Sequence, residues 1–156
     1  MRLSARAIVA FLALPGVVAG LLPALIARGS QVGRYRDASF VPFAIGTFCL
    51  IWCVRDFFVR GLGTLAPWDP PRRLVVGGLY RFVRNPMYLS VATVILGWSL
   101  YFGSWQLALY LGVVAIVFHL RVIVYEEPRL NRQFGPDWDQ YRARVPRWIP
   151  RFQARQ

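Results

Sequence analysis

Long runs without a charged side chain dominate the hydropathy pattern of this 156-residue chain. Residues 7–27 and 38–54 form two such runs, near the length of roughly 20 residues that a helix needs to cross a bilayer. A third run, residues 85–118, would be about 50 Å long as one helix, so it has to reverse. Gly103-Ser104 near its middle is the natural turn. The pattern therefore predicts helices over 7–27, 38–56, 86–102 and 105–126.

Two prolines, Pro15 and Pro23, interrupt the first predicted helix. In a bundle, neighbouring side chains can satisfy the carbonyls that a proline frees, so both are compatible with a membrane helix. An alternative is a cleaved signal peptide, because Arg2 and Arg6 precede the apolar run. The run is longer than a typical signal and lacks a small-x-small cleavage site, so we favour an uncleaved helix.

Composition agrees with a membrane protein. Hydrophobic residues make up 56% of the chain and charged residues 17%, although the net charge is +12. Such hydrophobicity excludes a disordered chain and argues against a soluble nucleic-acid-binding domain. We expect an all-α, polytopic membrane helix bundle of about four transmembrane helices, with a C-terminal helical hairpin. The whole chain, 1–156, is predicted to be one domain, with the first two helices in residues 1–60.

The arginines predict the orientation of this bundle. With four crossings, the N-terminus, the 55–85 segment and the tail share one side, which carries 16 of the 19 arginines. By the positive-inside rule, both termini lie in the cytoplasm. We expect a bacterial inner-membrane protein whose partners are membrane lipids and lipid-like molecules, not nucleic acid. Cys49 and Cys53 have no second Cys/His pair, so they are predicted to be small buried residues and not metal ligands.

The segment before the third helix combines glycine, arginine and proline. A Gly-Gly hinge at 77–78 is predicted to lead into a short helical turn. Asn85 is a favoured N-cap and Pro86 a favoured first helical residue. The free amides of that helix start, with Arg81 and Arg84 beside them, have the outline of an anion site. Binding of lipid phosphates by these arginines is an equally good interpretation of the same residues.

The fourth helix ends in two carboxylates, Glu126 and Glu127, which are costly at a membrane helix end unless paired or functional. Pro128 predicts a break at Glu127. His119 is seven residues before Glu126 and nearly on its helix face, and we expect a structural or interfacial role for it. Arg121, five residues before Glu126, is predicted to lie well round the helix. A solvated acidic pair bound to nearby arginines is the alternative.

Small residues should allow close packing of the third and fourth helices. They are Ser90, Thr93 and Gly97 on one helix and Gly112 and Ala115 on the other. This packing would bring the start of the third helix beside the end of the fourth.

A short helix is predicted to begin at Pro136 and to end before Pro146. Trp138, Tyr141 and Val145 share one side of it, so we expect an interfacial, membrane-anchoring helix on the cytoplasmic side.

At these motifs the chain resembles a known family. Residues 78–88 (GLYRFVRNPMY), 126–130 (EEPRL), Phe134-Gly135, Tyr141 and 144–147 (RVPR) look like the isoprenylcysteine carboxyl methyltransferase family. That family shares its membrane core with phospholipid methyltransferases. The resemblance covers about residues 63–150 and implies a membrane-embedded enzyme that uses S-adenosylmethionine. Its cofactor would lie in a cytoplasm-facing pocket made by the helical hairpin and the C-terminal segment.

The resemblance also implies site residues. The implied cofactor-binding residues are Leu74, Val75, Tyr80, Asn85, Pro86, Met87, Tyr88 and Glu126. Arg121 is the nearest match to the family's substrate-side basic residue. Many members have His where this chain has Asn85, and Asn cannot carry a proton, so this position is not expected to act as a base.

The predicted function is methyl transfer from S-adenosylmethionine to a lipophilic or lipid-modified acceptor that enters from the bilayer. A carboxylate is the preferred acceptor and needs no base, whereas an amine would need Glu127 or His119 to remove a proton. Arg121 and Glu127 are the candidate catalytic residues. The alternatives are a phospholipid amine or small-thiol methyltransferase, a sterol reductase with a related membrane core, and a non-enzymatic lipid-binding protein.

Overall fold

The computed structural model describes residues 12–60 and 73–151, and every regular element within these ranges is helical. The elements are η1 (Leu12–Leu21), α2 (Leu22–Ile26), α3 (Arg36–Arg60), η2 (Gly78–Arg81), α4 (Pro86–Phe102), α5 (Trp105–Arg121), η3 (Val122–Glu126), α6 (Glu127–Phe134) and α7 (Pro136–Arg144). Of these, η1 and η3 are π-helical and η2 is a 3₁₀ turn. The all-α prediction is confirmed for the described residues.

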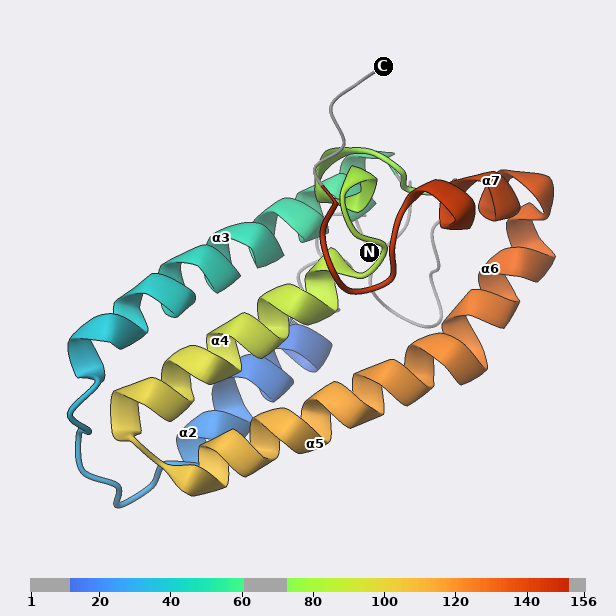
Figure 1. Ribbon diagram of the computed structural model, residues 1–156. Coiled ribbons are helices and arrows are strands. Elements are labelled where there is room, and N and C mark those ends of the chain that lie inside the picture. The colour runs from blue at the N-terminus through green and yellow to red at the C-terminus, as the bar shows by residue number, and fades with distance from the viewer. Residues whose placement is uncertain (1–11, 61–72, 152–156) are drawn as a thin grey trace.

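The long helices lie side by side, with α4 between α3 and α5 (Figure 1). The α2–α3 and α4–α5 connections lie at one end, and η2, α6 and α7 gather at the other. Two stretches in the described part of the chain, Arg36–Phe57 and Trp105–Phe134, are long and apolar enough to cross a membrane. Apolar side chains such as Ile116 and Val117 point outward from α5 and are more than half exposed. Such a surface is typical of a membrane protein.

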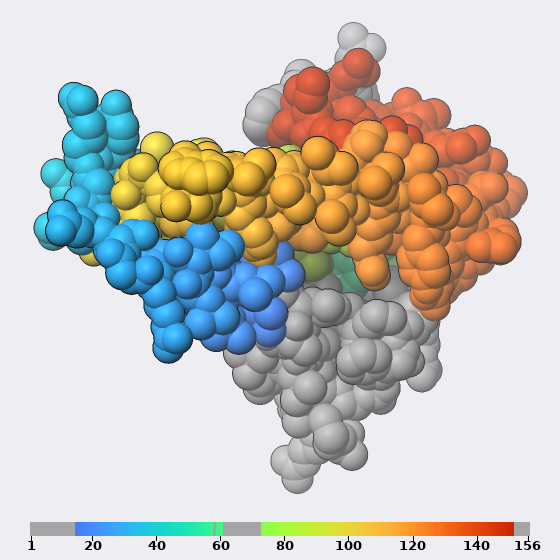
Figure 2. All heavy atoms as spheres, turned by 90° about the horizontal axis from the view of Figure 1, so that it is seen from below, coloured from blue at the N-terminus to red at the C-terminus, as the bar shows by residue number. Residues whose placement is uncertain are grey.

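The η1–α2 segment contains both prolines of the first predicted helix; the start of that helix lies outside the described residues. Pro23 has no N–H to donate to the carbonyls of Ala19 or Val18 in the preceding turn. Trp98 Nε1 donates to Ala19 O at 2.9 Å, and Tyr110 Oη donates to Val18 O at 2.9 Å. The predicted re-satisfaction by neighbouring helices is confirmed for Pro23; the carbonyls that precede Pro15 by one turn lie outside the described residues. Figure 2 shows α5 crossing one face of the molecule with the blue η1–α2 segment against it.

Small residues pack α4 against α3 instead of against α5. A Cβ on Gly97 would lie 2.8 Å from a ring carbon of Phe43 in α3. A Cβ on Gly46 of α3 would lie 2.9 Å from Ser90 O in α4. Nothing lies within 4 Å of the corresponding position on Gly112 of α5. The expected small-residue contact between the third and fourth helices is therefore wrong at these glycines, because the complementary bulky side chains belong to α3.

The predicted break at Glu127 is also wrong. Glu127 has helical φ and ψ of −62° and −43°, and the chain runs from α5 through η3 into α6 without leaving the helix. Pro128 would clash with the carbonyl four residues earlier in a regular α-helix. A π turn widens the helix by one residue, and η3 lies directly before the proline. The wider turn lets the helix pass Pro128.

The short helix after Pro136 is present as α7, but its apolar side faces the protein. Trp138, Tyr141 and Val145 are all less than a tenth exposed and form one cluster. Leu74 and Phe134 pack against this cluster. These side chains are therefore not free to anchor the helix in a membrane, because α6 and Leu74 already cover them.

The turn that begins η2 rests on a buried carboxylate of α3. Gly78 has φ +62°, in the left-handed region that favours glycine, and a Cβ there would collide with Asp56 Oδ2. Asp56 is fully buried, and its Oδ1 lies 3.4 Å from Arg60 Nε. The predicted Gly-Gly hinge thus sits where α3 presents its Asp56–Arg60 pair. Cys53, one turn earlier, is fully buried as expected, whereas Cys49 is only partly buried, so the burial prediction is wrong for Cys49.

The two glycine environments predict opposite effects of one substitution. Gly46→Ala forces a methyl group against the α4 backbone and should destabilise the protein by about 1–3 kcal/mol. Gly112→Ala, with open space around it, should stabilise the helix by about 0.5–1 kcal/mol. Thermal unfolding of both variants in the same detergent measures the difference. Equal shifts of the two melting temperatures would contradict this packing of α3 on α4.

Candidate active site

A cavity of about 380 Å³ opens among η1, η2, α4, α5 and η3–α6, within the size range of small-molecule sites. Its apolar lining includes Pro15, Val18, Val91, Val117 and Phe118, from η1, α4 and α5. Its charged lining consists of Arg84, Arg121, Glu126, Glu127 and Arg129. Three arginines against two glutamates leave the charged lining with an excess of positive charge.

Most of the site residues implied by the sequence line this one cavity. They are Leu74, Val75, Tyr80, Asn85, Met87, Tyr88, Arg121, Glu126 and Glu127. Pro86 is not part of the lining; it is buried and opens α4, as its position after Asn85 predicted. Segments that are about forty residues apart in the chain therefore meet at one cavity, and what each residue does there is a proposal taken up below.

Tyr88, Arg121 and Glu126 form a hydrogen-bonded cluster in the cavity wall. Tyr88 Oη donates to Glu126 Oε1. Arg121 Nε donates to the same carboxylate oxygen at 2.9 Å and to Tyr88 Oη at 3.1 Å. The predicted position of Arg121, well round the helix from Glu126, is therefore wrong. In the π turn η3, residues five apart share a face, whereas an α-helix of 3.6 residues per turn would separate them.

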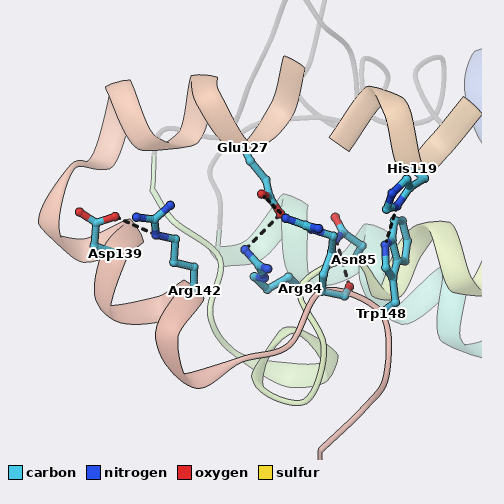
Figure 3. A network of polar contacts seen from close by, with 8 residues as sticks. Arg84, Asn85, His119, Glu127, Asp139, Arg142 and Trp148 are labelled. Carbon is cyan, nitrogen blue, oxygen red and sulfur yellow. Dashed lines mark hydrogen bonds and ion pairs between the residues drawn. The ribbon is translucent and has the colours of Figure 1, made fainter. Parts of the chain in front are cut away.

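The same turn moves His119 away from Glu126. His119 does not line the cavity; its Nδ1 accepts a hydrogen bond from Trp148 Nε1 at 3.1 Å (Figure 3). Trp148 belongs to the C-terminal segment, residues 145–151, which follows α7. The contact agrees with the expected structural role of this histidine.

Glu127 is bound by two arginines. Arg147 Nε donates to Oε1 at 2.7 Å and Arg147 Nη2 donates to Oε2 at 2.8 Å, a bidentate pair. Arg84 Nη1 lies 3.1 Å from Glu127 Oε1 (Figure 3). Sequence reasoning gave Arg147 no role. The available signal was its place in residues 144–147 (RVPR), the last segment of the family motif.

Asn85 does not cap α4 with its side chain. Its Nδ2 donates to Arg147 O at 3.1 Å, and no cap hydrogen bond is formed. Arg84 N donates to Pro146 O at 2.9 Å, and Arg151 N donates to Phe82 O at 3.1 Å. The start of α4 is thus bound to the C-terminal segment. The predicted capping role of the Asn85 side chain is wrong, because the side chain is directed to that segment and accepts no hydrogen bond from the first amides of α4.

Tyr80 and Tyr141 connect η2 to α7. Tyr141 Oη donates to Tyr80 O at 2.7 Å. Both rings are less than a tenth exposed, and burial raises the pKa of each phenol, because the phenolate would lose its hydration. Both groups are therefore neutral at physiological pH. Tyr80 completes the cavity wall as an aromatic group instead of an acid or base.

Comparison with known proteins places these residues in context. A family profile described as phospholipid methyltransferase matches residues 39–137, more than half of the chain. A protein-S-isoprenylcysteine O-methyltransferase of Schizosaccharomyces pombe is 35% identical over 77 residues, covering 49% of this chain and 33% of the relative. A Delta(14)-sterol reductase of Mus musculus is 36% identical over 100 residues, covering 61% of this chain and 23% of the relative.

An uncharacterized protein of Haemophilus influenzae is 35% identical over 65 residues, covering 40% of this chain and all of the relative. The chain thus spans about a third of the isoprenylcysteine methyltransferase and about a quarter of the sterol reductase. No solved structure matches the chain.

The contact across the π turn predicts energetic coupling between Arg121 and Glu126. Arg121→Gln and Glu126→Gln should be non-additive, with a coupling of about 0.5–3 kcal/mol in the free energy of unfolding. Denaturation in mixed detergent micelles measures the single and double variants. Arg121→Gln combined with Asp139→Asn is the control, because Asp139 pairs with Arg142 elsewhere, and should be additive. Additivity of the Arg121 and Glu126 effects would contradict the contact.

Proposed function

Because this chain belongs to the phospholipid methyltransferase family, we propose that it is a membrane methyltransferase. It transfers a methyl group from S-adenosylmethionine to a lipophilic acceptor, and that acceptor is a carboxylate. The observation that carries the proposal is the single cavity in which an apolar lining from η1 and α5 meets the Tyr88–Arg121–Glu126 cluster. One site can therefore accommodate a polar cofactor and an apolar substrate side by side.

The cavity's polar groups suit S-adenosylmethionine. This cofactor supplies an activated methyl group on a sulfonium, and the neutral thioether left after transfer, S-adenosylhomocysteine, is the leaving group. Glu126 offers a carboxylate to a positive or hydroxyl-bearing group, and Tyr88 orients that carboxylate through its hydroxyl. Tyr88 and Phe118 lie with ring centroids 4.3 Å apart and supply aromatic surface. Placement of two reactants is the main requirement of such a transfer, and these side chains are held by one another.

The state of the carboxylates favours an acceptor that arrives without a proton. Glu126 accepts from Tyr88 and Arg121, and Glu127 accepts two hydrogen bonds from Arg147. A general base has to be within hydrogen-bond reach of the proton it removes and free to receive it. Glu127 does not meet that condition, because Arg147 binds both of its oxygens, and His119 lies outside the lining. Glu126 uses Oε1 for Tyr88 and Arg121, and in this proposal its remaining oxygen is used by the cofactor. A carboxylate needs no base, and the positive charge of Arg121 attracts it as the candidate catalytic group.

A lipid amine is the second candidate acceptor, favoured by the family description itself. In that reaction Glu127 would be the base, and its ion pair with Arg84 or Arg147 would have to break first. A small thiol belongs to the same alternative. The sterol reductase relative shares a region of sequence with this chain but is about four times longer than the shared part, so reductase activity is the weaker interpretation.

We further propose that the chain crosses a bacterial inner membrane four times, with α4 and α5 as a hairpin. The site and both termini then face the cytoplasm. Arg28, Arg34 and Arg36 lie at the α2–α3 connection, away from the cavity, whereas most of the other arginines in residues 12–60 and 73–151 lie at the cavity end. This distribution supports the orientation by the positive-inside rule.

Methyl transfer tests the proposed reaction. Purified protein in vesicles, given S-adenosylmethionine with a labelled methyl group, should label a prenylated cysteine with a free carboxylate as a base-labile ester. The matching carboxamide and phosphatidylethanolamine should stay unlabelled. Tyr88→Phe should lower kcat/KM by about tenfold or more, because a hydrogen bond to a charged group is lost. Tyr101→Phe, in α4 but outside the cavity lining, is the matched control. Label only in phosphatidylethanolamine would establish the alternative.

Cysteine labelling tests the orientation. Ser30→Cys, in the exposed α2–α3 connection, should react with a membrane-impermeant maleimide in intact cells. Gln140→Cys, exposed on α7, should react only after the cells are lysed. The parent protein, with Cys49 and Cys53 alone, sets the background. The reverse pattern would place the cavity on the outer side.

A further inference from the structure

Arg84, a cation in the cavity wall, has more N–H donors than its described partners accept from, and its positive charge is only partly balanced. Arg84 lines the cavity, and its side chain is 11% exposed. Its guanidinium has one ion pair, from Nη1 to Glu127 Oε1. Its Nε is buried and has no hydrogen-bond partner among the residues that the structure describes. A guanidinium has five N–H donors, so most of its capacity is uncommitted.

Glu127 cannot neutralise both arginines, because it has one negative charge and also binds Arg147 through both carboxylate oxygens. Two arginines share one carboxylate, and the cluster has a net charge of +1. Burial lowers the pKa of Arg84 because the charged form loses hydration, and Glu127 opposes this effect. An arginine nevertheless keeps its charge in proteins. Arg84 is the arginine of this cluster that lines the cavity, so part of the excess positive charge faces the cavity through its guanidinium.

The direction of the Arg84 side chain is set from several sides. Its Cζ lies 5.6 Å from the ring centroid of Trp138 in α7, and its backbone N–H donates a hydrogen bond to Pro146 O. Arg147 is fixed in turn by Asn85, which donates to its carbonyl. Arg147 itself does not line the cavity. The Arg84 guanidinium thus lines the cavity. The Arg147 guanidinium lies outside the lining and holds the Glu127 carboxylate, which in turn binds Arg84.

We propose that Arg84 binds a ligand carboxylate in the cavity, and that Glu127 and Arg147 are positioning residues that hold its guanidinium there. This inference rests on the proposed function. A carboxylate can come from two sources, the amino-acid end of S-adenosylmethionine or the methyl acceptor. Both are recognised by the same chemistry, a planar donor group against two oxygens. Glu127 then acts through Arg84 and not as a proton acceptor.

The first experiment compares binding of S-adenosylmethionine and decarboxylated S-adenosylmethionine to the full chain in detergent, by calorimetry. If Arg84 holds the cofactor carboxylate, the wild-type protein prefers the carboxylate form by about tenfold or more, as expected for a charge-assisted hydrogen bond. Arg84→Gln should reduce the preference to about twofold, and Arg84→Lys should leave an intermediate preference. Thermal unfolding of each variant shows that the site is folded.

The second arm measures kinetics with the carboxylate acceptor. If Arg84 holds the acceptor instead, Arg84→Gln leaves the cofactor preference unchanged and raises KM for the acceptor by about tenfold, with a small change in kcat. Either result supports the proposal and identifies the source of the carboxylate. An Arg84→Gln protein with unchanged preference and unchanged KM would overturn it.

The positioning role is tested by residues that do not touch the ligand. Arg147→Gln should reproduce in part the loss caused by Arg84→Gln, and Glu127→Gln should do the same while the pH–rate profile keeps its shape. Loss of the acidic limb of that profile in Glu127→Gln would make Glu127 a base and overturn the positioning role. Arg142→Gln is the matched control, because Arg142 pairs with the exposed Asp139 (Figure 3).

The two proposals fail in different ways. A wild-type protein that binds neither form of the cofactor and methylates nothing contradicts the proposed function, and the carboxylate site with it. A wild-type protein that binds and methylates normally, with an indifferent Arg84→Gln variant, contradicts the carboxylate site alone.

Discussion

A helix that passes a proline gives up a hydrogen bond, and in this chain the helix before Pro128 widens at η3 (Val122–Glu126). The Arg121–Glu126 contact at the cavity depends on that extra residue. It turns Arg121 onto the face of Glu126 and keeps α6 in line with α5. It also directs His119 outward to Trp148. π turns are concentrated at functional sites because they reorient side chains at a small cost in helix geometry.

Two different sets of contacts stabilise the helix bundle and the cavity end. Close packing of α4 on α3, through glycines that leave room for a phenyl ring and a backbone carbonyl, builds a scaffold along the helices. Polar contacts at one end, among the start of α4, the Glu126–Glu127 pair and the C-terminal segment, build the site. The scaffold's association follows the small-residue packing of membrane helices, which needs no hydrophobic driving force. The site can therefore be polar and partly buried without weakening the bundle.

Local signals in the sequence predicted the boundaries of α4, because Pro86 and Gly103 act at the ends where they stand. The motif resemblance predicted which segments meet at the cavity. Three features could not be predicted from local signals. The phase of Arg121 required knowing that the helix contains a π turn, the partner of Gly97 required knowing that α3 offers Phe43, and the side chain of Asn85 is directed by a segment sixty residues later. The last two depend on contacts between distant parts of the chain, and the first depends on a local change of helix geometry before Pro128.

The carbonyls of Val18 and Ala19 have a consequence for biosynthesis. Their hydrogen-bond donors, Tyr110 and Trp98, lie 92 and 79 residues further along the chain. A ribosome therefore makes the acceptors long before it makes the donors. The first helical segment can complete its hydrogen bonding only after α4 and α5 exist, and its final docking is a late step of assembly. Because Pro15 and Val18 also form part of the cavity wall, the cavity itself is closed last.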